Sequence, residues 1–149
     1  SAEYFHKRKK CPHCAMLDFE LRDKKRLIFT NSDFVSFCPF VSRQAFEIRI
    51  FPRRHQPHFE KVTESEVENL AEVLRATLAK LAIGLKSPAY NFFIHTAPVS
   101  GGNELEHYHW HMEILPKTAI WAGFEIGTGI EISTIAPERA APFLRQVRV

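Results

Sequence analysis

One short stretch, residues 106–113 (EHYHWHME), constrains the fold of this chain more than any other. Residues two apart on a β-strand point to the same face of a sheet. On an extended strand one face therefore carries four polar side chains, those of His107, His109, His111 and Glu113. The opposite face carries Tyr108, Trp110, Met112 and Ile114. We predict a strand over residues 107–114 with one face in the core and the other lining a site, because aligned imidazoles bind metals, hold phosphate or attack phosphorus.

The rest of the chain predicts an antiparallel sheet and one long helix. Residues 27–29, 34–37, 45–51 and 90–95 are rich in β-forming side chains, and residues 45–51 alternate apolar with charged positions. Thr63 and Glu66 have the spacing of a capping box at the start of a helix over residues 63–83. We expect a glycine-punctuated β segment near residues 123–129 and a short helix over 137–147. The predicted class is α+β, with the long helix packed on the sheet and a short C-terminal helix.

Length and composition indicate a single domain over residues 11–149, preceded by a basic linker or boundary over residues 1–10. A hydrophobic content of 45% with 13 Phe excludes a disordered chain and a coiled coil. No apolar run reaches the roughly 18–20 residues that cross a membrane. The net charge of +3 makes nucleic acid an unlikely partner, although a small zinc domain that binds RNA through residues 7–10 is an alternative. Without a secretory signal, we expect a cytoplasmic protein with reduced thiols.

Cys11 and Cys14 supply half of a tetrahedral zinc site, and redox or disulfide chemistry is the alternative. The preferred third ligand is His55, with His58 as the alternate, and the preferred fourth ligand is His109, with His107 as the alternate. Two thiolates and two imidazoles favour zinc over iron. Four residues receive no role: Cys38 and His95 as buried core residues, and His6 and His13 as residues in polar surroundings.

Several segments together resemble the histidine triad (HIT) superfamily, whose pattern is His-φ-His-φ-His-φ-φ with φ apolar. The segments are CPHC (11–14), the strand that runs into PRRH (52–55), HWHMEILPK (109–117) and AGFEIGTG (122–129). They are most similar to the galactose-1-phosphate uridylyltransferase branch, and within it to the C-terminal HIT-like domain. The resemblance covers nearly the whole chain and implies a HIT-like fold.

The resemblance also implies residue roles. The ending ILPK (114–117) places Glu113 third in the triad, His111 at the middle, nucleophilic position, and His109 at the first, often a metal ligand. The alternative register uses His107, His109 and His111 as the triad. In the family mechanism His111 would attack the α-phosphorus of a nucleotide sugar and form a covalent nucleotidyl-histidine. The other ring nitrogen would donate to a backbone carbonyl, and Glu113 would raise the basicity of a neighbouring histidine or bind a metal.

Backbone and amide donors for phosphate are expected from Asn91 and from a loop after the fourth strand. That loop contains Ser100, Gly101, Gly102 and Asn103. A plain hairpin connection for the loop, and a turn or capping role for Asn91, are the alternatives.

Three functions follow from the resemblance. The first is a zinc-containing nucleotidyltransferase that moves a nucleoside monophosphate between a nucleotide sugar and a phosphate acceptor such as a sugar-1-phosphate. The second is a non-catalytic C-terminal half of such an enzyme, with a structural metal and a role in the dimer or the substrate pocket. The third is a HIT-type nucleotide hydrolase. Because HIT domains commonly pair their sheets, we also expect a homodimer, or a fused or partner HIT domain.

Overall fold

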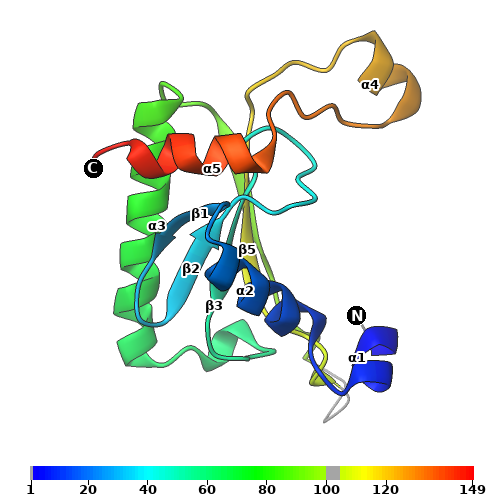
Figure 1. The fold of residues 1–149 in the computed structure, drawn as a ribbon, viewed down its shortest axis with the longest axis vertical. Helices are drawn as coiled ribbons and strands as arrows, with labels where there is room; N and C mark the ends of the chain where they lie inside the picture. The colour runs from blue at the N-terminus through cyan, green and yellow to red at the C-terminus, as the bar shows by residue number, and fades with distance from the viewer. Residues whose placement is uncertain (1, 100–104) are drawn as a thin grey trace.

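The computed structural model describes residues 2–99 and 105–149 (Figure 1). The strands are β1 (Leu27–Thr30), β2 (Phe34–Phe37), β3 (Ile48–Pro52), β4 (Tyr90–His95) and β5 (His111–Pro116). The helices are α1 (Ala2–Arg8), α2 (Pro12–Asp23), α3 (Glu64–Gly84), α4 (Gly123–Thr128) and α5 (Pro137–Gln146), with a 3-10 turn η1 (Phe59–Lys61).

The five strands form one antiparallel sheet in the order β1-β2-β3-β5-β4. This order places β5 between two strands that precede it in the chain. The register sets Arg49 of β3 opposite Glu113, and His95 of β4 opposite His111. The expected α+β class with an antiparallel sheet is confirmed, and β5 brings residues from three distant segments together.

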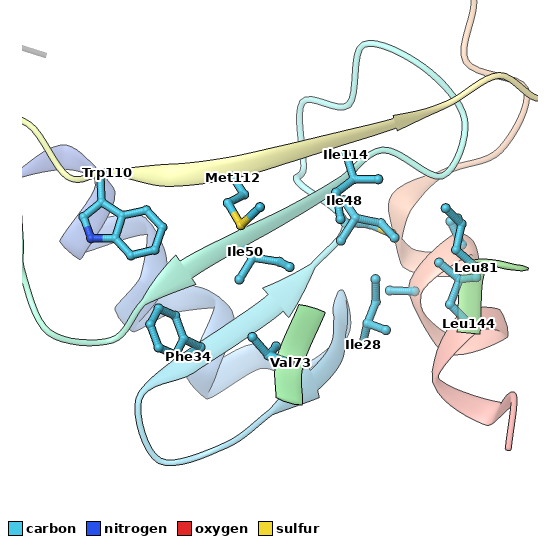
Figure 2. Packing of buried hydrophobic residues seen from close by; sticks show 13 residues of the cluster. Ile28, Phe34, Ile48, Ile50, Val73, Leu81, Trp110, Met112, Ile114 and Leu144 are labelled. Atoms are coloured by element: carbon cyan, nitrogen blue, oxygen red, sulfur yellow. The ribbon is translucent and has the colours of Figure 1, made fainter. Parts of the chain in front are cut away.

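Helix α3 covers one face of the sheet, and α5 crosses the C-terminal end of α3 (Figure 1). The helix begins as its capping box predicts: the Glu66 N–H donates to Thr63 Oγ1 over 3.3 Å, and the Thr63 N–H donates to the Glu66 carboxylate over 2.9 Å. Beneath α3 lies the main core (Figure 2), whose largest members include Phe34, Ile48, Ile50, Leu81, Trp110, Ile114 and Leu144. The apolar face of 107–114 is therefore the core face, as its alternation predicts.

Helix α2 packs on the opposite face of the sheet. It begins with Pro12 at its first position, which suits proline because that N–H has no partner inside a helix. Its Leu17 joins a second buried cluster with Leu27, Val35, Phe37 and Phe51. The polar face of β5 therefore points toward α2, whereas its apolar face points toward α3.

Three local expectations were wrong. Strand β5 begins at His111. Before it, the Trp110 N–H bonds to the Gln56 carbonyl in the loop after β3, and the Tyr108 N–H bonds to the Leu105 carbonyl in a turn, each over 2.9 Å. Residues 12–23, for which no helix was predicted, form α2. Residues 123–128 form helix α4 in place of the expected β segment, with Gly129 at φ 68° ending it.

The N-terminal segment contains helix α1, none of whose residues is buried. Its role as a linker or domain boundary stays a prediction. Among the described residues, no helix has the length and apolar character needed to cross a membrane.

Candidate functional site

Four side chains with metal-ligand chemistry meet where α2 begins against the sheet. Each offers one ligand atom, and these atoms all lie within 4.8 Å of one another. We name this set, which consists of Cys11, Cys14, His55 and His109, the Cys–His group. The Cys14 sulfur lies 3.3 Å from His55 Nδ1 and 3.5 Å from His109 Nδ1. Two sulfur and two imidazole donors suit a metal that takes four ligands.

The two cysteines share the first turn of α2. Cys11 precedes Pro12, and three residues along a helix bring Cys14 back to the same side. Cys11 is 4% exposed, whereas Cys14 is half-buried. The Cys14 thiol donates to the Cys11 sulfur, and this bond holds the pKa of Cys11 far below its usual range. The same bond and burial raise the pKa of Cys14, so the pair presents one thiolate before any metal binds.

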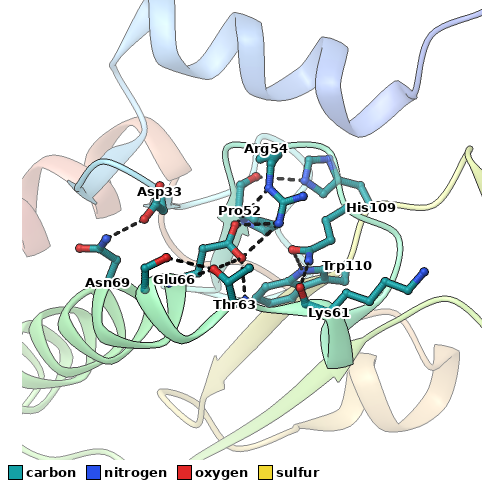
Figure 3. Close-up of polar contacts among 11 residues, drawn as sticks. Asp33, Pro52, Arg54, Lys61, Thr63, Glu66, Asn69, His109 and Trp110 are labelled. Atoms are coloured by element: carbon teal, nitrogen blue, oxygen red, sulfur yellow. Dashed lines mark hydrogen bonds and ion pairs between the residues drawn. The ribbon is translucent and has the colours of Figure 1, made fainter.

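His55 is exposed, but both of its neighbours are anchored; Figure 3 shows the contact of one of them, Arg54, with Glu66. Arg54 forms a two-pronged bond to the Glu66 carboxylate at 3.0–3.1 Å, which links it to the capped start of α3. On the other side, Gln56 accepts from the Trp110 indole over 3.0 Å. The position of His55 is therefore set by the core tryptophan and by the first turn of α3.

His109 uses both of its ring nitrogens. Its Nε2 lies 3.0 Å from the Pro52 carbonyl, which can only accept, so Nε2 carries the proton and donates. Nδ1 consequently has its lone pair directed at Cys14. A backbone carbonyl that fixes the tautomer in this way is the usual support of a metal-binding histidine.

A second set of polar side chains lies beside the first on the same face of β5. It consists of His95, His111 and Glu113, whose ligand atoms are also within 4.8 Å of one another, and we name it the His–Glu group. The Glu113 carboxylate lies 3.5 Å from His111 Nε2 and 3.6 Å from His95 Nε2. The ring of His111 stacks on Phe51, with 4.4 Å between centroids, and its Nδ1 donates to the His109 carbonyl over 3.1 Å.

Arg49 holds this second group in place from the neighbouring strand. Its guanidinium lies 3.1 Å from Glu113 and 2.9 Å from the fully buried Glu47. Burial raises the pKa of Glu113, but the His111 hydrogen bond and the charge of Arg49 outweigh it and bring that pKa to about 2. Glu113 is therefore an ionised carboxylate in a mostly buried network, in which Arg49 is shared with Glu47.

The other predicted residues are spread more widely. The carbonyl of His107 lies 3.6 Å from the Cys11 sulfur, and its ring lies on Tyr108. The ring of His58 faces Glu60 at 3.2 Å. Neither alternate ligand belongs to the Cys–His group, which contains the preferred His55 and His109.

Asn91 lies at the far end of β4 from His95, four residues and about 13 Å along the strand. It lines a cavity of about 520 Å³ between the sheet and the segment that carries α4. Other residues of this cavity are Gln44, Lys117, Trp121, Glu125 and Glu131. The predicted phosphate loop of Ser100, Gly101, Gly102 and Asn103 lies outside the described residues.

Three residues of the site were missed or misplaced. The side chain of His95 is 52% exposed and faces Glu113, so its assignment to the core was wrong. The ring of His13 packs against Phe51 and His111, and burial together with His111 lowers its pKa to about 4. Arg49 has no sequence signal beyond its place in an alternating strand.

The fold is that of the histidine triad proteins. A zinc-bound histidine triad family protein from Mycobacterium smegmatis matches with a TM-score of 0.61 over 92% of this chain and 91% of that one, at 16% identity. A solved structure of ADP-glucose phosphorylase from Arabidopsis thaliana with bound ADP-glucose matches with a TM-score of 0.85 at 36% identity. That match covers 99% of this chain and 46% of the phosphorylase chain.

The sequence comparisons identify the branch. The family model for the C-terminal domain of galactose-1-phosphate uridyl transferase matches residues 1–148, and the chain belongs to this family. It is 36% identical to the Arabidopsis ADP-glucose phosphorylase over 146 residues, which is 97% of this chain and 40% of that protein. It is 27% identical to the Thermotoga maritima galactose-1-phosphate uridylyltransferase over 154 residues, which is 99% of this chain and 48% of that protein. The chain therefore spans less than half the length of these relatives.

Proposed function

We propose that this chain acts as the C-terminal half of a nucleotidyltransferase that uses a nucleotide sugar and a sugar-1-phosphate, and that it does not supply the nucleophile. The observation that carries this proposal is the contact between His111 and Glu113. Because His111 Nδ1 donates to the His109 carbonyl, Nε2 is the nitrogen left to attack phosphorus. That nitrogen is already engaged by the ionised Glu113 carboxylate 3.5 Å away, which both occupies it and repels an incoming phosphate.

The proposal favours the non-catalytic role among the three functions that the sequence predicts. Two further findings support it: the matching family model is that of the C-terminal domain, and the relatives are more than twice the length of the matched region. The nucleophilic role of His111 stays a prediction, which the experiment below tests.

The Cys–His group is proposed to hold one structural zinc ion. Cys11, Cys14, His55 and His109 provide the two thiolates and two imidazoles of a closed tetrahedral site, and His109 is already in the tautomer that such a site needs. The ion would connect three parts of the chain through its four ligands: the start of α2, the loop after β3 and the residues just before β5. A closed site leaves no position for substrate, so this role is separate from catalysis.

The chain is also proposed to pair with a second HIT-like unit, either a fused domain or a second copy. Strand β4 ends the described sheet and exposes Phe92 by 56%. The segment with α4 stands away from the body of the molecule (Figure 1) and exposes several large apolar side chains. These are Ile120, Trp121, Phe124, Ile126 and Ile130. Exposed apolar surface of this extent is typical of an interface.

The test is the intact mass of the chain after brief incubation with ADP-glucose, UDP-glucose and dinucleoside polyphosphates. Wild type and His111→Ala are treated in parallel, and zinc is measured in the same samples. We expect about one zinc per chain in both and no nucleotidyl adduct in either. An adduct on wild type that His111→Ala abolishes would establish His111 as a nucleophile and overturn the proposed half-domain role. Steady hydrolysis of a dinucleoside polyphosphate would favour the hydrolase instead.

A further inference from the structure

We infer that the Cys–His group is a peroxide-sensitive clamp, in which oxidation joins Cys11 to Cys14 and releases the metal. The inference rests on the zinc site proposed above. It concerns what these two cysteines can do besides binding, and it starts from their placement in one turn of α2.

The two sulfurs are positioned to form a disulfide without movement of the backbone. Cys11 and Cys14 are three residues apart at the start of α2, and their sulfur atoms lie within 4.8 Å of each other. A disulfide requires neighbouring Cα atoms on the same side of the chain, which a single helical turn provides. Closing the bond therefore needs only rotation of the two side chains.

Access to the group is unequal. Cys14 is half-buried and its neighbour His55 is exposed, whereas Cys11 is 4% exposed behind the His107 carbonyl. Peroxide from solvent therefore reaches Cys14 first, and Cys11 is the thiol that resolves the product. The third cysteine, Cys38, is 1% exposed in the core beneath α3, on the other face of the sheet, so it does not compete.

The chemistry balances with hydrogen peroxide as the only oxidant. As metal ligands both cysteines are thiolates. The Cys14 thiolate attacks one peroxide oxygen, the O–O bond breaks, and a sulfenic acid forms as hydroxide leaves and becomes water. The Cys11 sulfur then attacks the Cys14 sulfur, and the S–S bond forms as a second hydroxide leaves and becomes water. Two thiolates lose two electrons in total, and the peroxide gains two electrons and two protons.

Oxidation would open the clamp without unfolding the domain. The disulfide removes two of four ligands, and His55 with His109 alone makes a weak site for zinc. Helix α2 would keep its apolar contacts through Leu17 and Phe51 but lose its connection to residues 55 and 109. The result is a local loosening at the first turn of α2, next to the His–Glu group.

The experiment uses the whole chain with its zinc content measured first. The protein is treated with hydrogen peroxide, and released zinc, free thiols and intact mass are followed together. We expect zinc release in step with the loss of two thiols, a mass lower by two hydrogens, and a peptide that links Cys11 to Cys14. Dithiothreitol with zinc should restore the starting state. Amide exchange should rise in the first turn of α2 and stay unchanged in the centre of α3.

The matched variant is Cys38→Ala, which should release zinc at the wild-type rate. Zinc retained under conditions that oxidise free cysteine would overturn the inference while leaving the proposed zinc site intact. Release that accompanies a disulfide to Cys38, or sulfinic and sulfonic acids at Cys11 and Cys14, would also overturn it. A chain that contains no zinc before treatment overturns the proposed metal site, and the inference with it.

Discussion

The Cys–His group and the His–Glu group lie side by side on one face of β5 and satisfy their polar atoms in different ways. In the His–Glu group, the cationic side chain of Arg49 lies 3.1 Å from Glu113, so the protein itself supplies a counter-charge. In the Cys–His group the four donors have no cationic side chain among them. The first group is complete as a hydrogen-bonded and ion-paired network, whereas the second needs an ion to gather its donors.

This difference separates two roles that the alternating histidines suggested equally well. His109 and His111 are two residues apart and share a face, yet one directs a lone pair at a sulfur and the other faces a carboxylate. The partners come from other segments, namely α2 for His109 and β3 and β4 for the surroundings of His111. Neighbouring strands and helices, and not the histidines themselves, therefore decide what each imidazole does.

The largest expected effect comes from Cys14→Ser, which removes one thiolate from the Cys–His group. Ligand binding stabilises the folded state by about 4 kcal/mol when free zinc exceeds its Kd about a thousandfold. We expect this zinc-dependent increase in the free energy of unfolding to disappear in the variant and to persist in Cys38→Ala. Urea unfolding with and without zinc measures it. A zinc-dependent increase that survives in Cys14→Ser would show that the ion binds elsewhere.

Glu113→Gln tests the claim that the second group is held by its own charges. The variant leaves Arg49 partly buried with Glu47 as its remaining partner, and we expect a loss of about 2 kcal/mol in the free energy of unfolding. Zinc content should not change. Glu131→Gln is the control, because its 3.6 Å pair with the exposed Arg43 should contribute less than about 0.5 kcal/mol. Loss of zinc in Glu113→Gln would show that the two groups act as one site.

Acid should weaken the His–Glu group over a defined range of pH. The pKa of Glu113 is about 2 in the folded chain and about 4.3 in an unfolded one. Its stabilising contribution is therefore fully present above about pH 5 and is lost as the pH falls toward 2. In zinc-free protein, we expect the difference in unfolding free energy between wild type and Glu113→Gln to shrink over this range. A difference that is constant from pH 6 down to about pH 2 would contradict the ion-pair account.

The smallest expected effect is that of Thr63→Ala, which acts on the Cys–His group from a distance. Loss of the cap should cost about 1 kcal/mol of stability. Glu66 also binds Arg54, the residue before His55, so a small part of this lost stability should be felt at the metal site. We therefore expect zinc affinity to fall, by no more than about threefold. Glu68→Gln, at an exposed position in the second turn of α3, should change neither quantity. Equal effects of the two variants on zinc affinity would disconnect the cap from the metal group.

Elements with strong local patterns could be predicted from the sequence. The alternation that ends in Trp110, Met112 and Ile114 identified the core face of β5, and Thr63 with Glu66 marked the start of α3. Helix α2 lacks a clear apolar stripe, so its sequence did not predict it. The helix is positioned by the packing of Leu17 against the sheet. The segment around α4 has three glycines among β-forming residues, and such a pattern does not distinguish a short capped helix from a strand.

The residues of the candidate site also fall into those that a local pattern predicts and those that depend on how the strands pair. The local spacing of Cys11 and Cys14 predicts a metal site, and the segments that carry His55 and His109 resemble those of a known family. The pairing of Arg49 with Glu113 depends on the register between strands more than sixty residues apart in the sequence, which no local pattern specifies. The placement of His95 opposite His111 has the same origin.

The exposed strand β4 has a consequence for handling the chain by itself. A terminal strand presents unpaired backbone groups along its free side, and β4 adds Tyr90 and Phe92 at 42% and 56% exposure without a proline or a bulge to block approach. Such a strand is a template on which another extended segment can add. We therefore expect this edge to limit the solubility of the purified chain, and Phe92→Lys to raise that solubility.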